Sequence, residues 1–344
     1  MLNSLPAIRV GKVTAIDADD EERLHALADQ MASHGYSVRQ TPHFVVCQRS
    51  DRAPDLVLIH TFDTTSIDED LPDMIGVELG GIGAVRTENE YSDALFAIMA
   101  SSFQRANAND DAELSSLAIW RRYSLNTLVR LRPLLTEDHP QSKRTASHVA
   151  QFAIIYRRVL KLGIGTTFLD VGTSLGFLPI LTAELVNALA ITACDSRPEV
   201  LNCAADLAAT TKNDRIHFLV RDVLQPDFQQ LGQFDTVSAV HLIEHFTDEQ
   251  LPTALTNLLE VTAHRLIIAV PYEPEMQALY GHKQLFNEMR LRSLGEWCVE
   301  HLNGGRFLYE EVSGGLLMIE RAARTRIPRW RTHTDAALRP NESA

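Results

Sequence analysis

From residue 165 onward, short apolar runs alternate with segments whose apolar residues recur every three or four positions. Such runs predict buried β-strands, whereas the three- and four-residue spacing predicts amphipathic helices. Strands are expected over residues 167–171, 189–194, 216–221, 234–240 and 265–270. Strict alternation of strands and helices predicts a parallel sheet with crossover helices, so the fold class is α/β.

Two more strand patterns close this region, Phe307–Val312 and Gly315–Ile319, and Ser313-Gly314 joins them. A short glycine-containing connection between two such runs predicts a β-hairpin. The expected sheet therefore has seven strands, the last two forming a C-terminal hairpin.

The pattern divides the chain into four parts. Residues 1–87 mix short strand patterns with one helix pattern and predict a small α/β module of unknown role, in which 67–73 is an acidic loop. Residues 88–162 have helical spacing and predict a helical segment. Residues 163–322 form the main α/β domain, and residues 323–344 form a basic, flexible tail.

A length of 344 residues agrees with about two domains. No apolar run is long enough to span a membrane, and the N-terminus lacks a secretory pattern. The 4 cysteines have no C-x-x-C spacing, so we expect reduced thiols in a cytoplasmic protein. Composition leaves the oligomeric state open.

The net charge of −13 disfavours non-specific binding to nucleic acid. Arginines nevertheless gather around Trp330, at positions 321, 324, 326, 329 and 331. They form either a solvated tail or an arm that grips an anionic substrate or partner.

The segment from Phe168 to Gly176 combines an apolar strand, an acid and a glycine turn before a helix. Glycine in such a turn lets the backbone approach a ligand closely, although it can also serve only strand–helix packing. Asp170 precedes the turn, where a carboxylate would repel a pyrophosphate, so an NAD-dependent reductase is disfavoured. A cationic ligand fits best.

Two more acids follow neighbouring strands of the predicted sheet. Asp195 ends the second strand and Asp222 the third. Because open α/β sheets bind ligands at the carboxyl ends of their strands, the three acids are expected to line one site.

The pattern Asp170-x-Gly172-x-Ser174-x-Gly176 resembles the first motif of class I S-adenosylmethionine-dependent methyltransferases, D-x-G-x-G-x-G, with Ser174 in place of the middle glycine. The resemblance covers about residues 142–322 and implies a Rossmann-like seven-stranded sheet that ends in a hairpin. It implies that Asp170 and the turn, with Gly172, Thr173, Ser174 and Gly176, hold the methionine end of S-adenosyl-L-methionine. Asp195 would bind the ribose, Asp222 the adenine amino group, and Val223 would stack on adenine or donate its backbone N–H.

The fourth strand leads into Val240-His241-Leu-Ile-Glu244-His245. A Glu-His pair at this place matches many members of the family, and the resemblance places His245 towards the transferred methyl. Because an alcohol acceptor must lose its proton, His245 is the preferred general base, with His241 and His282 as alternates. Helices before the first strand often cover the active site in this family, so Arg144, His148 and Tyr156 are pocket candidates by position.

We therefore expect O-methylation of a small-molecule or glycan hydroxyl. The stretch Tyr280-Gly-His-x-x-x-Phe286 is similar to bacterial mycofactocin-type oligosaccharide O-methyltransferases.

Three alternatives remain open. The chain could be a metal-assisted RNA ribose 2′-O-methyltransferase, in which His241, Glu244, His245 and His282 hold a divalent metal, because plant-type small-RNA 2′-O-methyltransferases have a similar E-x-x-E-H…H pattern. We favour a metal-free site. The domain could be a non-catalytic cofactor-binding partner subunit. His245 could also only pack or cap its turn.

Overall fold

The structure is a computed structural model in which residues 7–49, 56–106, 115–136, 147–322 and 327–332 are described. Two compact units make up the chain. The first comprises residues 1–129 and 278–281, and the second residues 130–277 and 282–344. The sequence predicts a boundary near residue 87, but the contacts change from one unit to the other inside α4 (Ser116–Thr136). Because α4 is one continuous helix, its apolar spacing does not change at the boundary, and the hydrophobic pattern therefore misses it.

The first unit contains a five-stranded sheet in the order β1-β2-β5-β4-β3. Only β2 and β5 pair in parallel among these strands. The strands are β1 (Ala7–Val10), β2 (Val13–Asp17), β3 (Ser37–Gln40), β4 (Val45–Gln48) and β5 (Leu56–His60).

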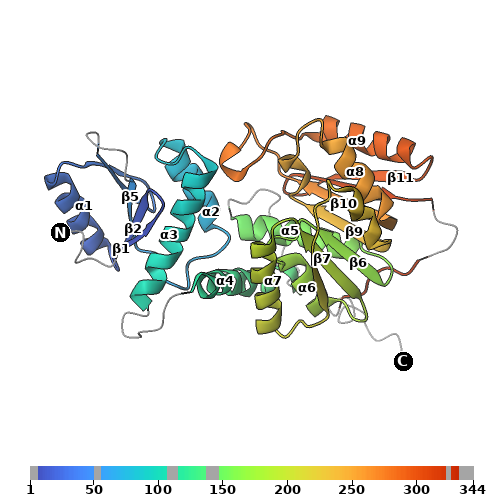
Figure 1. Cartoon of the computed structure of the whole chain (residues 1–344), viewed down its shortest axis with the longest axis horizontal. Coiled ribbons are helices and arrows are strands. Elements are labelled where there is room, and N and C mark those ends of the chain that lie inside the picture. Colours follow the sequence, from blue (N-terminus) through green and yellow to red (C-terminus); the bar gives the residue numbers. More distant parts are fainter. Residues whose placement is uncertain (1–6, 50–55, 107–114, 137–146, 323–326, 333–344) are drawn as a thin grey trace, which may run out of the picture. The chain divides into compact units, whose positions relative to one another are not determined.

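Helices α1 (Glu21–Ser33) and α3 (Glu88–Ala106) pack on this sheet, which lies between them (Figure 1). Asp20 caps α1, since its side chain accepts a hydrogen bond from the backbone N–H of Arg23 at 2.8 Å. Leu24, Leu27 and Met31 of α1 are buried with alternate residues of the strands.

The predicted loop at 67–73 is wrong at its end, where α2 (Leu71–Met74) begins and runs into the π-helix η2 (Ile75–Gly80). Leu71, Ile75 and Leu79 are buried one turn apart and stabilise this helix despite Pro72 and the glycines. In the same unit, η5 (Ala278–Tyr280) places the ring of Tyr280 edge to face on Tyr91, with centroids 5.3 Å apart.

The second unit contains a seven-stranded sheet in the order β11-β12-β10-β9-β6-β7-β8. The five strands from β10 to β8 are parallel, and the hairpin of β11 and β12 adds β12 antiparallel to β10. This confirms the predicted Rossmann-like sheet with its C-terminal hairpin. The strands are β6 (Thr167–Val171), β7 (Ala190–Asp195), β8 (Ile216–Val220), β9 (Phe234–Val240), β10 (Thr262–Val270), β11 (Arg306–Glu311) and β12 (Gly315–Glu320).

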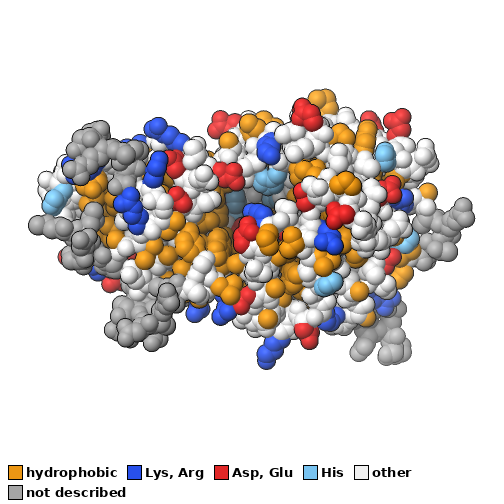
Figure 2. Space-filling view, viewed as in Figure 1, with side chains coloured by type: hydrophobic (Ala, Val, Ile, Leu, Met, Phe, Trp, Pro, Cys, Tyr) orange, Lys and Arg blue, Asp and Glu red, His pale blue; other side chains and the backbone are white. Residues whose placement is uncertain are grey.

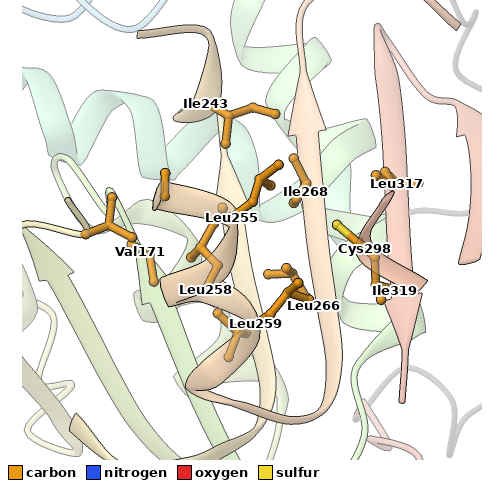
Figure 3. Close-up of a cluster of buried hydrophobic side chains, with 14 of the residues drawn as sticks. Val171, Ile243, Leu255, Leu258, Leu259, Leu266, Ile268, Cys298, Leu317 and Ile319 are labelled. Carbon is orange, nitrogen blue, oxygen red and sulfur yellow. The ribbon is translucent and has the colours of Figure 1, made fainter. Parts of the chain in front are cut away.

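Helices connect and cover these strands: α5 (His148–Leu162), α6 (Phe177–Leu185), α7 (Pro198–Thr210), α8 (Leu251–Glu260) and α9 (Glu288–His301), with the short 3₁₀ turns η3 (Pro226–Leu231) and η4 (Ile243–His245). Leu255, Leu258 and Leu259 of α8 enter the core beside Ile268 of β10 and Leu317 of β12 (Figure 3). The core continues to Ile243, so it fixes the turn that carries the catalytic candidates.

The C-terminal part was predicted to be flexible from residue 323, but residues 327–332 pack on the second unit. Trp330 is buried, and its ring meets Phe168 edge to face at 5.1 Å between centroids. Its backbone N–H donates to the Gly163 carbonyl at 3.1 Å. Composition marks this stretch as basic and polar, whereas one buried indole decides its placement.

Among the described residues, no helix combines the length and apolarity that crossing a membrane requires. All four cysteines are unpaired.

Candidate active site

The glycine turn after β6 is held against the end of β7. The backbone N–H groups of Gly172 and Thr173 both donate to the Cys194 carbonyl, at 2.9 and 3.0 Å. Gly172, Ser174 and Gly176 have φ values of +72°, +50° and +78°. A side chain at Gly172 would be strained and would place its Cβ 2.8 Å from Leu242, whereas at Gly176 the Cβ would approach Ala204 of α7 to 3.1 Å. Gly176 thus also allows close packing against α7.

Asp170 lies at the end of β6 and is almost fully buried. Ser238 of β9 donates to its Oδ1 at 2.5 Å. Burial raises the pKa of Asp170 to about 6, against the opposing effect of the Ser238 hydrogen bond. A buried carboxylate that is costly to ionise is suited to a ligand that brings positive charge.

Asp195, at the end of β7, turns towards the glycine turn. Its Oδ2 accepts from the backbone N–H of Ser174 at 3.1 Å, and its Oδ1 accepts from the backbone N–H of Arg197 at 3.1 Å. The two amides fix the carboxylate beside the turn. Oδ1 also accepts from Nε of Arg197 at 3.3 Å, so Oδ2 is the oxygen that retains capacity for a further hydrogen bond, as a ribose hydroxyl would require.

Asp222 follows β8 and is partly exposed. Its Oδ1 accepts from the backbone N–H of Leu224 at 2.9 Å, which fixes the side chain in a local turn. The Val223 side chain packs in the hydrophobic core. Of the two roles expected for Val223, donation from the backbone N–H suits this burial better than stacking.

His241, directly after β9, has a left-handed backbone with φ +50°. Such a conformation in a histidine is costly and is typical of functional turns. Its ring contacts Phe152 of α5 at 5.1 Å between centroids, and its buried Nε2 has no hydrogen-bond partner in the part of the chain that the structure describes. Burial, reinforced by His148, His282 and His245, lowers the pKa of His241 to about 3. His241 is therefore a neutral imidazole and a weak base.

Glu244, His245 and His282 come together at the carboxyl end of β9, with one ligand atom of each within 4.8 Å of the others. Glu244 is buried, and within the described residues neither of its carboxylate oxygens has a hydrogen-bond partner. Burial raises the pKa of Glu244 to about 8, and Glu273 contributes to the increase. An unpartnered buried carboxyl invites either a proton or a cation. These three residues can hold a divalent metal, with His241 nearby.

Glu273 is the residue that the sequence analysis missed. It lies in the loop after β10, and its Oε2 is 3.0 Å from Nδ1 of His282. Nothing in the local sequence pattern of this loop links Glu273 to a histidine nine positions later. Of the pocket candidates on the preceding helices, His148 helps to lower the pKa of His241, and Tyr156 is buried against Phe152. Arg144 lies outside the described residues.

A family model described as a methyltransferase domain matches residues 168–265. This range starts in β6 and contains the glycine turn, the three strand-end acids and the pair Glu244-His245. The family match and the order of the strands in the sheet indicate the same class of enzyme. The second unit contains a class I S-adenosylmethionine-dependent methyltransferase domain. Among curated proteins, none matches the chain.

Solved structures with similar folds include three methyltransferases. The small RNA methyltransferase HEN1 has 14% identity and a TM-score of 0.44, and the match covers 57% of this chain but only 28% of that protein. An O-methyltransferase family protein from Burkholderia thailandensis has 14% identity and a TM-score of 0.41 over 74% of this chain and 94% of its own. Magnesium protoporphyrin IX methyltransferase (ChlM) from Synechocystis PCC 6803 has 17% identity and a TM-score of 0.39, covering 62% and 100%.

The methyltransferase domain is an enzyme whose cofactor is S-adenosyl-L-methionine. The residues present fit this cofactor, because Gly172 at φ +72° shapes the turn after β6, and Asp170 supplies a buried carboxylate beside it.

Proposed function

We propose that the methyltransferase domain transfers a methyl group to a hydroxyl of a small molecule or glycan, with His245 as the general base. The observation that supports this is the cluster of Glu244, His245 and His282 at the end of β9, beside the strand-end acids. S-adenosyl-L-methionine, when bound, supplies an electrophilic methyl group. The chain must then position an acceptor and remove its proton.

His245 suits proton removal because an unperturbed imidazole changes protonation near neutral pH. His282 lies edge to face against it, and the contact with Glu273 fixes the tautomer and orientation of His282. His241 is a poorer base, since its lowered pKa gives it little affinity for a proton. Its buried, unpartnered Nε2 is better suited to hold a ligand.

The proposed cofactor contacts involve the turn residues Gly172, Thr173, Ser174 and Gly176, with Asp170 providing negative charge. Asp195 would accept hydrogen bonds from the ribose, Asp222 would accept one from the adenine amino group, and the Val223 N–H would donate to the ring.

A second candidate is metal-assisted methylation of a ribose hydroxyl in RNA. The observation that favours a metal is that both Glu244 oxygens and His241 Nε2 are buried without a hydrogen-bond partner. Imidazole and carboxylate ligands suit a divalent ion, which would polarise a hydroxyl. The net charge of −13 opposes an RNA acceptor, and acidic and basic side chains intermingle on the face shown in Figure 2.

The deciding experiment incubates the full chain with methyl-labelled cofactor and either small molecules and glycans from a lysate or total RNA. Each arm is run with and without EDTA. We expect label in a small molecule or glycan, as an ether, with EDTA leaving the rate unchanged. Labelled RNA whose formation stops with EDTA and returns with added Mg²⁺ or Mn²⁺ would establish the second candidate instead.

A further inference from the structure

A cavity in the second unit lies at the end of the sheet opposite to the cofactor candidates. The cofactor candidates lie at the carboxyl ends of β6 to β9, whereas this cavity lies where β10 and β11 begin and β12 ends. It has a volume of about 1040 Å³, and residues 327–329 and 331 form part of its wall. The size suits a small organic ligand.

The wall of this cavity is strongly basic although the chain is acidic overall. One carboxylate, that of Glu320, lines it. The basic residues that line it are His264, Arg265, Arg306, Arg321, Arg329 and Arg331. Five guanidinium groups around one hollow repel one another unless anions compensate them.

Glu320 compensates two of these arginines. Nε of Arg265 donates to its Oε1 at 2.8 Å, and Arg306 pairs with its Oε2. Arg265 also donates to the Leu162 carbonyl at 2.7 Å. These two guanidinium groups therefore have structural partners within the wall.

The other three arginines retain free donors. Arg321 donates to the Leu259 carbonyl at 2.7 Å through Nη2, but its buried Nε has no hydrogen-bond partner among the described residues. Within the described part of the chain, the side chains of Arg329 and Arg331 make no hydrogen bond or ion pair, and both are exposed. A buried N–H without an acceptor costs free energy, and an anion bound in this cavity would remove that cost.

Trp330 holds the two exposed arginines at this cavity. Its indole lies so close to Gly163 that a Cβ there would be 2.1 Å from the ring. The backbone on both sides is also fixed, because Gly165 N–H donates to the Pro328 carbonyl at 2.8 Å and Thr332 bridges to Val186. The backbone at Arg329 and Arg331, which flank Trp330, is therefore fixed beside this cavity.

We propose that this cavity binds a small anion that carries two or more phosphate groups. Guanidinium groups form paired hydrogen bonds with phosphate oxygens, and three arginines with free donors can engage more than one phosphate. The proposed cofactor site lies at the carboxyl ends of β6 to β9, away from this cavity, so anion binding here does not depend on the methyl-transfer chemistry.

Isothermal titration of the full chain with inorganic tripolyphosphate tests this proposal. We expect saturable binding that weakens as salt rises, and at least about tenfold weaker binding in R329Q/R331Q. The matched control K12Q/R23Q removes the same charge from two exposed residues of the first unit and should bind as the wild type does. Both variants should bind S-adenosylhomocysteine unchanged. If the double variant is unstable, the single R331Q variant provides the same comparison.

Absence of saturable binding, or equal weakening in the control variant, would overturn the proposal. Pyrophosphate and ADP distinguish two sources of the same chemistry: tighter binding of ADP identifies a nucleotide, and equal binding identifies free phosphate groups. A single-stranded RNA that binds these arginines much more tightly than tripolyphosphate would also overturn the small-ligand proposal.

Discussion

The imidazole rings of His245 and His282 meet edge to face, with their centroids 4.9 Å apart. His245 belongs to the turn after β9, and His282 to the segment between β10 and α9. Glu244 completes a cluster with them, and Glu273 contacts His282 from the far side. One buried acid, two histidines and a supporting acid therefore converge where the methyl acceptor is proposed to bind.

Replacing His245 by alanine tests the general base. We expect turnover to fall by about 10²–10⁴-fold, because proton removal from a hydroxyl loses its catalyst. Affinity for S-adenosylhomocysteine, measured by calorimetry, should stay nearly unchanged. The matched control is H217A, at an exposed histidine of β8, which should keep full turnover. If H245A also keeps full turnover, His245 has no role in the reaction.

Glu273 is predicted to be a positioning residue for His282. E273A should lower kcat by about tenfold or more with little change in KM, because His282 loses the partner that orients its ring. E273Q should restore most of kcat, since an amide oxygen still accepts from Nδ1. E275A, at an exposed acid of the same loop, is the control. Equal loss in E273Q and E273A would show that charge, and not orientation, is required.

Asp170 predicts the pH dependence of cofactor affinity. Burial raises its pKa to about 6, and a cationic ligand favours its ionised form. Affinity should therefore fall as pH drops below about 6, by about tenfold for each pH unit. Calorimetry from pH 5 to 8 measures this. D170N should bind weakly with no such dependence; a sloping profile in D170N would assign the titration to another group.

The same carboxyl predicts a change in stability. Because its pKa is raised by folding, its contribution is fully present below about pH 4 and is lost as pH rises through about 6. The rise of slightly more than two pK units on folding corresponds to about 3 kcal/mol of lost stability at neutral pH. D170N should therefore have a higher Tm than the wild type at pH 7.5 without ligand, and a similar Tm at pH 4. A lower Tm at pH 7.5 would contradict the burial argument.

Gly172 is expected to be required for the cofactor turn. G172A adds strain at φ +72° and a contact of 2.8 Å with Leu242, so it should destabilise the fold by about 1–3 kcal/mol and weaken S-adenosylhomocysteine binding. Gly35 provides a matched control, with φ +81° and no atom within 4 Å of an added Cβ. G35A should show backbone strain without loss of cofactor affinity. Normal binding by G172A would place the cofactor elsewhere.

Local patterns predicted much of the second unit. The range of β9 agrees with its apolar run at both ends, and the closing hairpin lies where Ser313-Gly314 indicated it. The glycine turn and the acids after β6, β7 and β8 were also recognised. Strand period, turn chemistry and the order of strands and helices are properties of neighbouring residues, so a sequence states them directly.

Other features depend on contacts between distant residues. The acidic, glycine-containing sequence around Leu71 predicted a loop, but a helix runs from Leu71 into η2. It forms because Leu71, Ile75 and Leu79 are buried by tertiary packing. The placement of residues 327–332 depends on the burial of Trp330 against Phe168, which the basic composition of the tail conceals.

By itself, the sequence determined the α/β class of the second unit, the strand ends that carry acids and the turn that suits the cofactor. Only the tertiary structure decided that Glu273 joins the predicted group of Glu244, His245 and His282, that arginines surround a separate cavity, and that the boundary between the units lies inside α4. The physical reason is that periodicity and turn preferences act over a few residues, whereas these groupings arise from burial and pairing between segments far apart in the chain.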